Sequence, residues 1–307
     1  MTAMRKWLSA AAALAVPAGL SAVLLGSRAL NRLIRNDVWA LFAQAAPTAS
    51  GIVTEAMLQD LPEPVRRYLT YTGVVGKPLV GTVHLRQKGK MRLGAGQPWL
   101  PLDAEQYYSV RPPGFVWSGT IHLGPLPLAR ARDRYLDGNG NMLIKAGSVV
   151  TVADATGAEM DQGSMMRYLS EMIWFPAAFL GDNIAFEPID ASSARVTLTD
   201  HGRSATAIMY FDQQGRLTNL VAKRYRMADR GYALEIWSTP VVEYGELAGL
   251  RLPVRGKAVW KRPDGDLEYI DVTITELEYN LDSRDAAPAA ASTEPEAIAP
   301  PGAGPVA

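Results

Sequence analysis

Between Val83 and Leu277 the chain repeats short segments in which apolar and polar residues alternate. Such alternation is typical of β-strands with one buried face and one solvated face. One Met- and aromatic-rich segment, Met165–Leu180, interrupts the series with apolar residues at helical spacing. The pattern therefore predicts a mostly β fold in which one helical segment lies against a sheet.

The connections between the alternating segments are short, and we count about ten strands. Short connections make neighbouring strands antiparallel, because parallel strands need long crossovers. A sheet of this width must twist and curl. We therefore predict an α+β, mostly β fold, in which a wide curved antiparallel sheet, or half-barrel, is covered by a helical lid. The space beneath the lid is either packed core or a ligand pocket.

The lid helix is expected to begin near Ser164, which is a good N-cap, and to break at Phe175 because Pro176 follows. Met and Leu residues form one apolar side of this helix. Arg167 and Glu171 are four residues apart on the other side, where they can pair.

The chain begins with Arg5 and Lys6, followed by an uncharged segment, Trp7–Leu25. At about 1.5 Å per residue this length just spans a bilayer. We predict that residues 1–27 form a membrane anchor, which makes an N-terminal membrane helix part of the predicted fold. The alternative is a signal peptide that is cleaved after Ala18 or Ala29.

Residues 28–51 are predicted to form a basic amphipathic helix and a hinge. Apolar residues from Leu30 to Phe42 recur at helical spacing, opposite Arg28, Arg32 and Arg35. This helix suits an anionic membrane surface, and the alternative is a helix packed on the domain. Residues 52–284 are predicted to form the half-barrel domain. Residues 285–307 are predicted to be a disordered tail, since they are rich in Ala, Pro and Gly.

Composition excludes several classes of protein. Lys plus Arg equals Asp plus Glu, 31 each, which argues against a dedicated nucleic-acid binder. The absence of cysteine excludes disulfides, a thiol nucleophile and cysteine-ligated metal. His84, His122 and His201 lack metal-ligand spacing, and no nucleophile elbow or Walker loop occurs. We therefore expect no metal, no cofactor and no catalytic residue.

The segment Val83–Leu93 places basic residues at every second position: His84, Arg86, Lys88, Lys90 and Arg92. This basic stripe is either a surface for lipid headgroups or an acidic partner, or a solvated strand face. In the second case it pairs with Asp103 and Glu105 on the next strand, which is the ordinary arrangement.

Three strings carry a resemblance to a known family: LPEPVRRYL at 61–69, RPPGFVW at 111–117 and MRYLSEMIWFP at 166–176. Over roughly residues 61–280 the chain resembles an uncharacterised bacterial domain family of unknown function. The sheet-plus-lid pattern is also similar to the LolA/LppX-like lipoprotein carriers, half-barrels whose concave apolar face holds acyl chains. This resemblance implies a periplasmic domain anchored in the inner membrane, or a periplasmic protein after signal cleavage.

We therefore predict a membrane-tethered envelope protein that binds a lipid or another hydrophobic molecule on the concave face. The apolar lining is expected to comprise Phe115, Trp117, Met142, Ile144, Trp174, Phe175, Phe179 and Trp237. Glu171, Glu235 and Arg226 are candidate polar handles, although Glu235 can instead form a structural ion pair with Arg224 or Arg226. The alternatives are a non-enzymatic interaction module at the membrane surface and a carboxylate-dependent enzyme. No protein partner is indicated.

Overall fold

The computed structural model describes the backbone of residues 2–46, 51–228 and 231–281, and side chains from Ser21 onward. The predicted hinge at 47–51 lies mostly outside these residues, and the predicted tail at 285–307 lies wholly outside them. The predicted domain boundaries therefore stay predictions.

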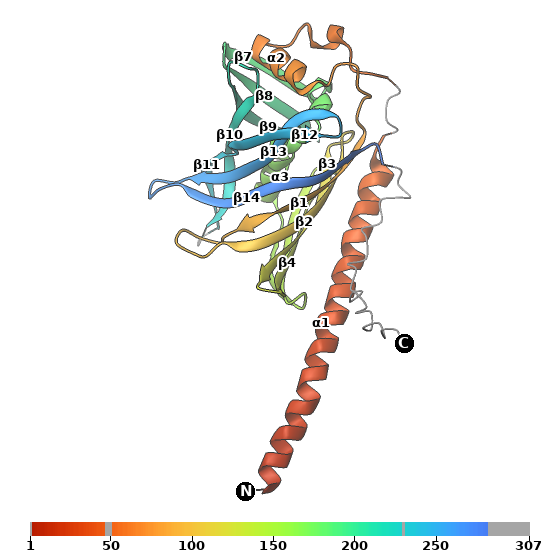
Figure 1. The fold of residues 1–307 in the computed structure, drawn as a ribbon, viewed down its shortest axis with the longest axis vertical. Coiled ribbons are helices and arrows are strands. Elements are labelled where there is room, and N and C mark those ends of the chain that lie inside the picture. Colours follow the sequence, from red (N-terminus) through yellow and green to blue (C-terminus); the bar gives the residue numbers. More distant parts are fainter. Residues whose placement is uncertain (1, 47–50, 229–230, 282–307) are drawn as a thin grey trace, which may run out of the picture.

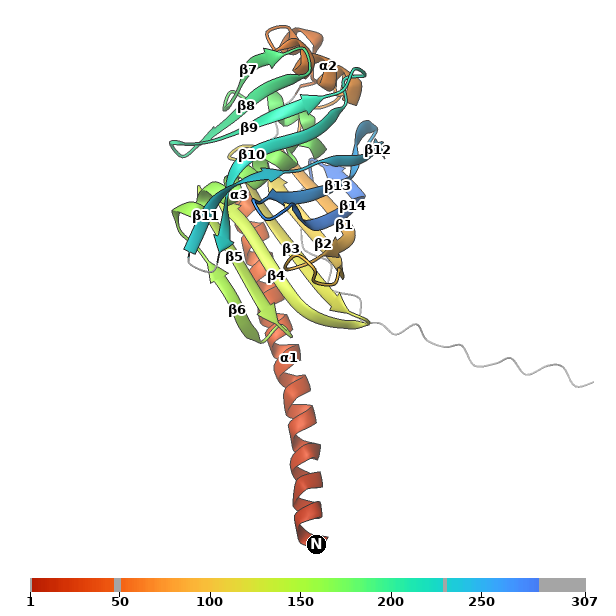
Figure 2. The same ribbon diagram turned by 90° about the vertical axis from the view of Figure 1, so that its left-hand side faces the viewer.

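One curved antiparallel sheet of 14 strands dominates the fold (Figures 1 and 2). Its order is β6-β5-β4-β3-β2-β1-β14-β13-β11-β10-β9-β8-β7, and β12 pairs with β13 beside this path. The strands are β1 (Thr82–Met91), β2 (Leu100–Ser109), β3 (Gly114–Leu123), β4 (Leu126–Leu136), β5 (Asn139–Ala146), β6 (Val150–Ala155), β7 (Ile184–Asp190), β8 (Ser193–Asp200), β9 (Arg203–Phe211), β10 (Leu217–Ala228), β11 (Gly231–Ser238), β12 (Val241–Leu247), β13 (Leu250–Lys261) and β14 (Leu267–Tyr279). The prediction of a wide, curved, mostly β sheet is confirmed.

The sheet has more strands than the ten or so expected from the sequence. One reason is that the alternating segment 142–153, which reads as a single strand in the sequence, forms parts of two, since Gly147 and Ser148 adopt positive φ of 53° and 63° and reverse the chain. The strands β4, β7 and β12 were not recognised from the pattern.

In the part of the chain that the structure describes, three α-helices and three 3-10 helices accompany the sheet. They are α1 (Thr2–Gln44), η1 (Glu55–Leu58), α2 (Glu63–Thr72), α3 (Ala158–Glu171), η2 (Met172–Trp174) and η3 (Pro176–Leu180). The segment α3-η2-η3 lies against the concave face, as predicted for the lid (Figure 1). It begins earlier than expected, with Gly157 as N-cap, and Ser164 is buried within the helix. The predicted break is present between Phe175 and Pro176.

The convex face of the sheet carries the last third of α1 (Figure 2). The apolar side of this helix packs on side chains from β2, β3, β4 and β5. The buried cluster contains Leu30, Ile34, Val38, Leu41, Phe42, Tyr107, Val116, Leu136 and Leu143. The prediction that this apolar side lies along a membrane surface is therefore wrong, because the sheet already covers it. The alternative, a helix packed on the domain, is correct.

Polar contacts fix α1 to the alternate arginines of β4. The side chain of Asp37 is buried, at 7% exposure. One of its carboxylate oxygens lies 2.6 Å from Nη1 of Arg134, and the other lies 3.3 Å from Nε of Arg132. Arg130 donates a hydrogen bond of 2.7 Å to Oδ1 of Asn31. Each of the three convex-face arginines of β4 thus has a partner on the helix.

The N-terminal membrane anchor predicted for residues 1–27 is not supported. In the part of the chain that the structure describes, no helix is long and apolar enough to cross a bilayer. The uncharged segment Trp7–Leu25 contains many small residues, together with Pro17 and Gly19, which lower its apolarity.

Two turns from distant parts of the sheet contact each other. His201, between β8 and β9, places Nε2 2.9 Å from the carboxylate of Asp137, between β4 and β5. Its Nδ1 lies 3.1 Å from Oδ1 of Asp200, whose other oxygen accepts a hydrogen bond of 2.7 Å from the Tyr135 hydroxyl. Arg203 donates to the carbonyl of Gly138 at 2.6 Å. We call this contact the turn clasp.

The turn clasp is expected to weaken as pH rises. The hydrogen bond to Asp200 raises the pKa of His201 above its usual value, and Asp137 adds to the shift. A histidine with a raised folded-state pKa contributes stability that is complete below about pH 6.5 and is lost as pH rises through the raised value. The thermal midpoint of His201→Asn should therefore fall below that of the native protein at pH about 6 and match it at pH about 9. Equal midpoints at both pH values would contradict the assignment.

Candidate functional site

The polar side of α3 is turned into the sheet rather than towards solvent. The Arg167 guanidinium lies 2.7 Å from a carboxylate oxygen of Asp133 on β4 and 2.9 Å from Glu171 one turn along the helix. The other Glu171 oxygen accepts hydrogen bonds from Gln106 Nε2 at 2.7 Å and the Tyr108 hydroxyl at 3.0 Å. We call these five residues the lid network. It joins the middle of the lid to β2 and β4 through charged hydrogen bonds.

Aromatic rings surround the cation of the lid network. The Arg167 guanidinium carbon lies 5.1 Å from the ring centre of Phe115 and 5.0 Å from that of Trp117. Burial alone would lower the pKa of Arg167, but the carboxylates of Glu171 and Asp133 outweigh burial and raise it. The guanidinium is therefore held charged in a largely dry site, where cation–π contacts are strongest.

The aromatic residues predicted to line a ligand site lie on the concave side and pack closely. Phe175 lies between Tyr108 and Tyr168, with ring centres 4.8 and 5.8 Å away. Phe179 packs on Phe186 at 6.0 Å. The structure thus brings this part of the predicted lining into the main core.

The remaining predicted lining residues lie on the same side of the sheet. Trp174 donates to the carbonyl of Pro253 at 3.1 Å, and Trp237 donates to the Tyr269 hydroxyl at 3.1 Å. Met142 and Ile144 are half-buried at the margin of the core. A ligand contact for any of the eight stays a prediction.

The predicted polar handles are occupied by partners within the chain. Glu171 belongs to the lid network. Glu235 accepts two hydrogen bonds from Arg226, at 2.7 and 2.8 Å, as the structural alternative for this carboxylate expected. The hydrogen bond from Arg226 lowers the pKa of Glu235.

Three of the five residues in the basic stripe of β1 lie close to carboxylates of the neighbouring strands, which supports the solvated-face interpretation. Arg86 lies 3.5 Å from Glu105 and 3.4 Å from Glu276. Lys90 lies 3.9 Å from Asp271 and 5.0 Å from the Trp99 ring centre. His84 lies 2.8 Å from Glu105, so both neighbouring strands supply counter-charges.

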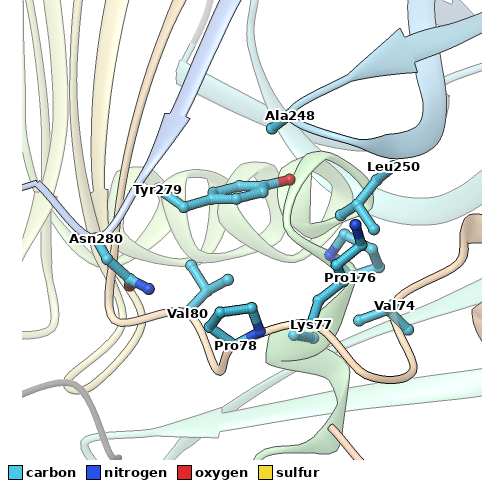
Figure 3. Close-up of a pocket in the computed structure, with 10 residues that line it drawn as sticks. Val74, Lys77, Pro78, Val80, Pro176, Ala248, Leu250, Tyr279 and Asn280 are labelled. Atoms are coloured by element: carbon cyan, nitrogen blue, oxygen red, sulfur yellow. The ribbon is translucent and has the colours of Figure 1, made fainter. Parts of the chain in front are cut away.

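A pocket of about 200 Å³ opens beside η3, between the α2–β1 loop and the β12–β13 turn (Figure 3). Most of its lining is apolar, and it comes from four separate segments. The lining residues are Val74, Lys77, Pro78, Val80, Pro176, Ala177, Ala248, Leu250, Tyr279 and Asn280. None of the residues predicted from sequence to line a site lies in this pocket, although Pro176 and Ala177 directly follow the predicted Trp174 and Phe175.

The polar groups of the pocket differ in their freedom to bind a ligand. Asn280 is held within the chain, since its amide donates to the Leu79 carbonyl and accepts from the Gly81 amide. The Tyr279 hydroxyl donates to the carbonyl of Trp174. Lys77 is exposed, and no described residue forms an ion pair with its ammonium group. The pocket therefore combines an apolar wall with one available cation (Figure 3).

The lid network and the pocket cation Lys77 differ in how far the sequence could have predicted them. Asp133 alternates with Ala131 and Tyr135 along β4. This carboxylate in an apolar register would have indicated a buried polar site, but the strand itself was not recognised from the sequence. Lys77 gave no comparable signal, because loop lysines are ordinarily solvated. Among the described residues, no group of three His, Asp or Glu side chains is arranged to hold a metal ion.

Comparison with known proteins identifies a family and distant structural neighbours. Residues 51–272 match the model of a family described as a family of unknown function (DUF6544). This confirms the resemblance to a domain of unknown function. Among curated proteins, no significant match exists.

Three solved structures resemble the chain at low similarity. A DUF1329 family protein from Desulfovibrio piger has 9% identity and a TM-score of 0.41, covering 75% of this chain and 95% of its own. A LolA superfamily protein from Nitrosomonas europaea has 7% identity and a TM-score of 0.40, covering 76% and 97%. A lipoprotein-sorting protein domain from Vibrio parahaemolyticus has 8% identity and a TM-score of 0.38, covering 67% and 88%. Scores this low carry no inference about ligand or activity.

Proposed function

Because the chain belongs to the DUF6544 family, whose function is unknown, we propose from the geometry of the site that it binds a hydrophobic ligand in the pocket beside η3. The observation that carries the proposal is the lining itself. Apolar side chains from the α2–β1 loop, η3 and β13 surround a space beside the lid, and a single cation stands at its edge. Concave apolar sites with few polar groups are the usual form of small-molecule sites.

The size of the pocket limits the ligand. An apolar cavity of about 150 Å³ admits a benzene-sized molecule, whereas drug-sized ligands occupy about 300 Å³ or more. The 200 Å³ pocket therefore fits a small apolar molecule or one end of a longer chain. The ammonium group of Lys77 favours a ligand that carries an acidic group next to its apolar part.

The predicted aromatic lining lies behind this pocket. Trp174 and Phe175 adjoin Pro176 in the chain, and the Tyr279 hydroxyl ties the pocket wall to the carbonyl of Trp174. A longer ligand would reach these rings if η2 and η3 moved away from β13 and β14. This extension brings Trp174 and Phe175 of the predicted lining within the proposal.

Filling the pocket is expected to abolish ligand uptake. Val80→Phe places a ring in the apolar wall, and Val242→Phe on the exposed side of β12 is the matched control. Native mass spectrometry after incubation with a medium-chain fatty acid measures the bound fraction. We expect at least a tenfold loss for Val80→Phe and no loss for the control, since burying even a few methylene groups contributes about 0.8 kcal/mol each.

Two charge-reversal variants in the same experiment test the role of the Lys77 ammonium group. Lys77→Glu should weaken uptake of the fatty acid but not of the corresponding alcohol, whereas Lys88→Glu on β1 should affect neither. Uptake that is equal in all four variants would show that the pocket is not the binding site.

The periplasmic location and the interaction-module alternative stay predictions. The module alternative relied on the basic stripe, and the pairing of Arg86, Lys90 and His84 with carboxylates weakens that basis. A carboxylate-dependent enzyme has less support, because Glu171 and Glu235 are both held by arginines.

A further inference from the structure

Two neighbouring hairpins expose large apolar side chains at their tips. The β3–β4 tip exposes Leu123, Leu126 and Leu128, and the β5–β6 tip exposes Val149, Val150 and Val152, each at least 43% exposed. Soluble proteins seldom gather such residues at one place without a partner. Turns are ordinarily polar, so six apolar residues at two tips need an explanation.

Helix α1 passes directly beside one of these tips. A Cβ atom on Gly26 would lie 2.5 Å from the Ser148 carbonyl and 3.2 Å from Val149 Cγ2, so glycine is what permits the close contact. Just before Gly26, Leu24 and Leu25 are 60% and 63% exposed. Both hairpin tips lie at the level where α1 leaves the sheet and continues alone (Figures 1 and 2).

The three segments lack acidic residues altogether. Neither 7–36, 121–132 nor 142–153 contains Asp or Glu, although the chain has 31 such residues. Their charged residues are cations, of which Arg28 and Arg32 are exposed and have no ion-pair partner among the described residues. Asp103 of β2, which lies opposite Thr120 of β3, is paired with His122 at 3.0 Å.

We propose that this end of the molecule docks onto an anionic lipid surface. We name its apolar part, the two hairpin tips and Val23–Leu25 of α1, the apolar collar. Apolar side chains that project from separate tips can enter the boundary between headgroups and acyl chains to a depth of about 5–10 Å. The neighbouring arginines then meet the anionic headgroups. The inference needs neither a membrane-spanning helix nor the ligand pocket.

The charge and shape of this end of the molecule favour a lipid surface over a protein partner. It combines the separate tips of the apolar collar with neighbouring cations, whereas protein interfaces are continuous faces with complementary charges of both signs. A fluid, anionic lipid surface can contact all the tips at the same time.

The absence of cysteine permits a direct test on the full chain. Single variants Leu126→Cys, Val150→Cys and Ile189→Cys are labelled with an environment-sensitive fluorophore. Ile189 is an apolar residue that is 46% exposed on β7, and Figure 1 shows this strand at the other end of the sheet from the β4 label. Each labelled protein is mixed with vesicles of phosphatidylcholine containing phosphatidylglycerol, and lipid-borne quenchers at known depths report the position of the label.

The expected result is a blue shift and shallow quenching at 126 and 150, with neither change at 189. The double variant Leu126→Ser/Val150→Ser should reduce the fraction of protein that floats with vesicles by at least about tenfold, because each apolar side chain loses its burial in lipid. Raising salt or omitting phosphatidylglycerol should also reduce it.

Two outcomes would overturn the proposal. Labels at 126 and 150 that stay in water while the protein binds vesicles would show that only α1 meets the lipid. A blue shift without vesicles that grows with protein concentration would show that a second copy of the chain covers the collar instead.

Discussion

Replacing Arg167 with methionine is expected to lower the free energy of unfolding by about 3–5 kcal/mol. The substitution keeps much of the side-chain volume but leaves the carboxylates of Asp133 and Glu171 without their cation. Asp133 is almost completely buried, and one of its oxygens has no hydrogen-bond partner among the described residues. A buried carboxylate that loses its partner must be protonated or draw in water, and either costs free energy.

Urea denaturation measures this effect, with Arg195→Met as the matched control. Arg195 and Glu187 form a short ion pair that is 45% and 63% exposed, so its loss should cost less than about 1 kcal/mol. Neutralising the carboxylates as well, in Arg167→Met/Asp133→Asn/Glu171→Gln, should recover part of the loss. If the single variant were as mild as the control, the lid network would have no part in holding α3 on the sheet.

Asp37→Ala is expected to release α1 from the convex face at a cost of about 3–5 kcal/mol. The variant leaves Arg132, whose side chain is 5% exposed, without its counter-charge. It also removes the partner of Arg134. Burial lowers the pKa of Arg132, and the Asp37 carboxylate opposes this shift. Because Asp37 lies on α1 and Arg132 on β4, this pair exists only while the helix contacts the sheet.

Limited proteolysis and urea denaturation together measure this release. The exposed neighbour Asn36 supplies the control, since Asn36→Ala changes a helix position that does not face the sheet. We expect rapid cleavage within residues 28–44 of Asp37→Ala and slow cleavage in the control. Protection of both variants would mean that the apolar cluster around Val38 holds the helix without the ion pairs.

The sequence predicted the class of the fold because strand alternation depends on local chain geometry alone. Recognition failed where both faces of a strand are covered. In β4, Arg130, Arg132 and Arg134 face α1, while Ala131 and Asp133 face the lid. The arginines therefore mimic a solvated face, and nothing local in the chain shows that a helix from a hundred residues earlier covers them.

The site was predicted less completely, for a related reason. The aromatic segment after α3 was located correctly, but the burial of the opposite side of the helix was not predicted. The sequence placed Arg167 and Glu171 there as a pair, and this pair is present. Their burial depends on Asp133, Gln106 and Tyr108, which reach the helix only after the sheet has curled. The pocket residues come from four separate segments of the chain, and no local sequence pattern predicts that these segments come together.

The docking of α1 on β2–β5 has a consequence for the order of events on the ribosome. The residues Leu30–Phe42 leave the exit tunnel first, while Tyr107, Val116, Leu136 and Leu143 follow some 65–110 positions later. Translation proceeds at about 5–20 residues per second, so several seconds pass before the strands that bury the apolar side of α1 have been synthesised. During that interval, the nascent chain offers this apolar side to any chaperone or lipid within reach.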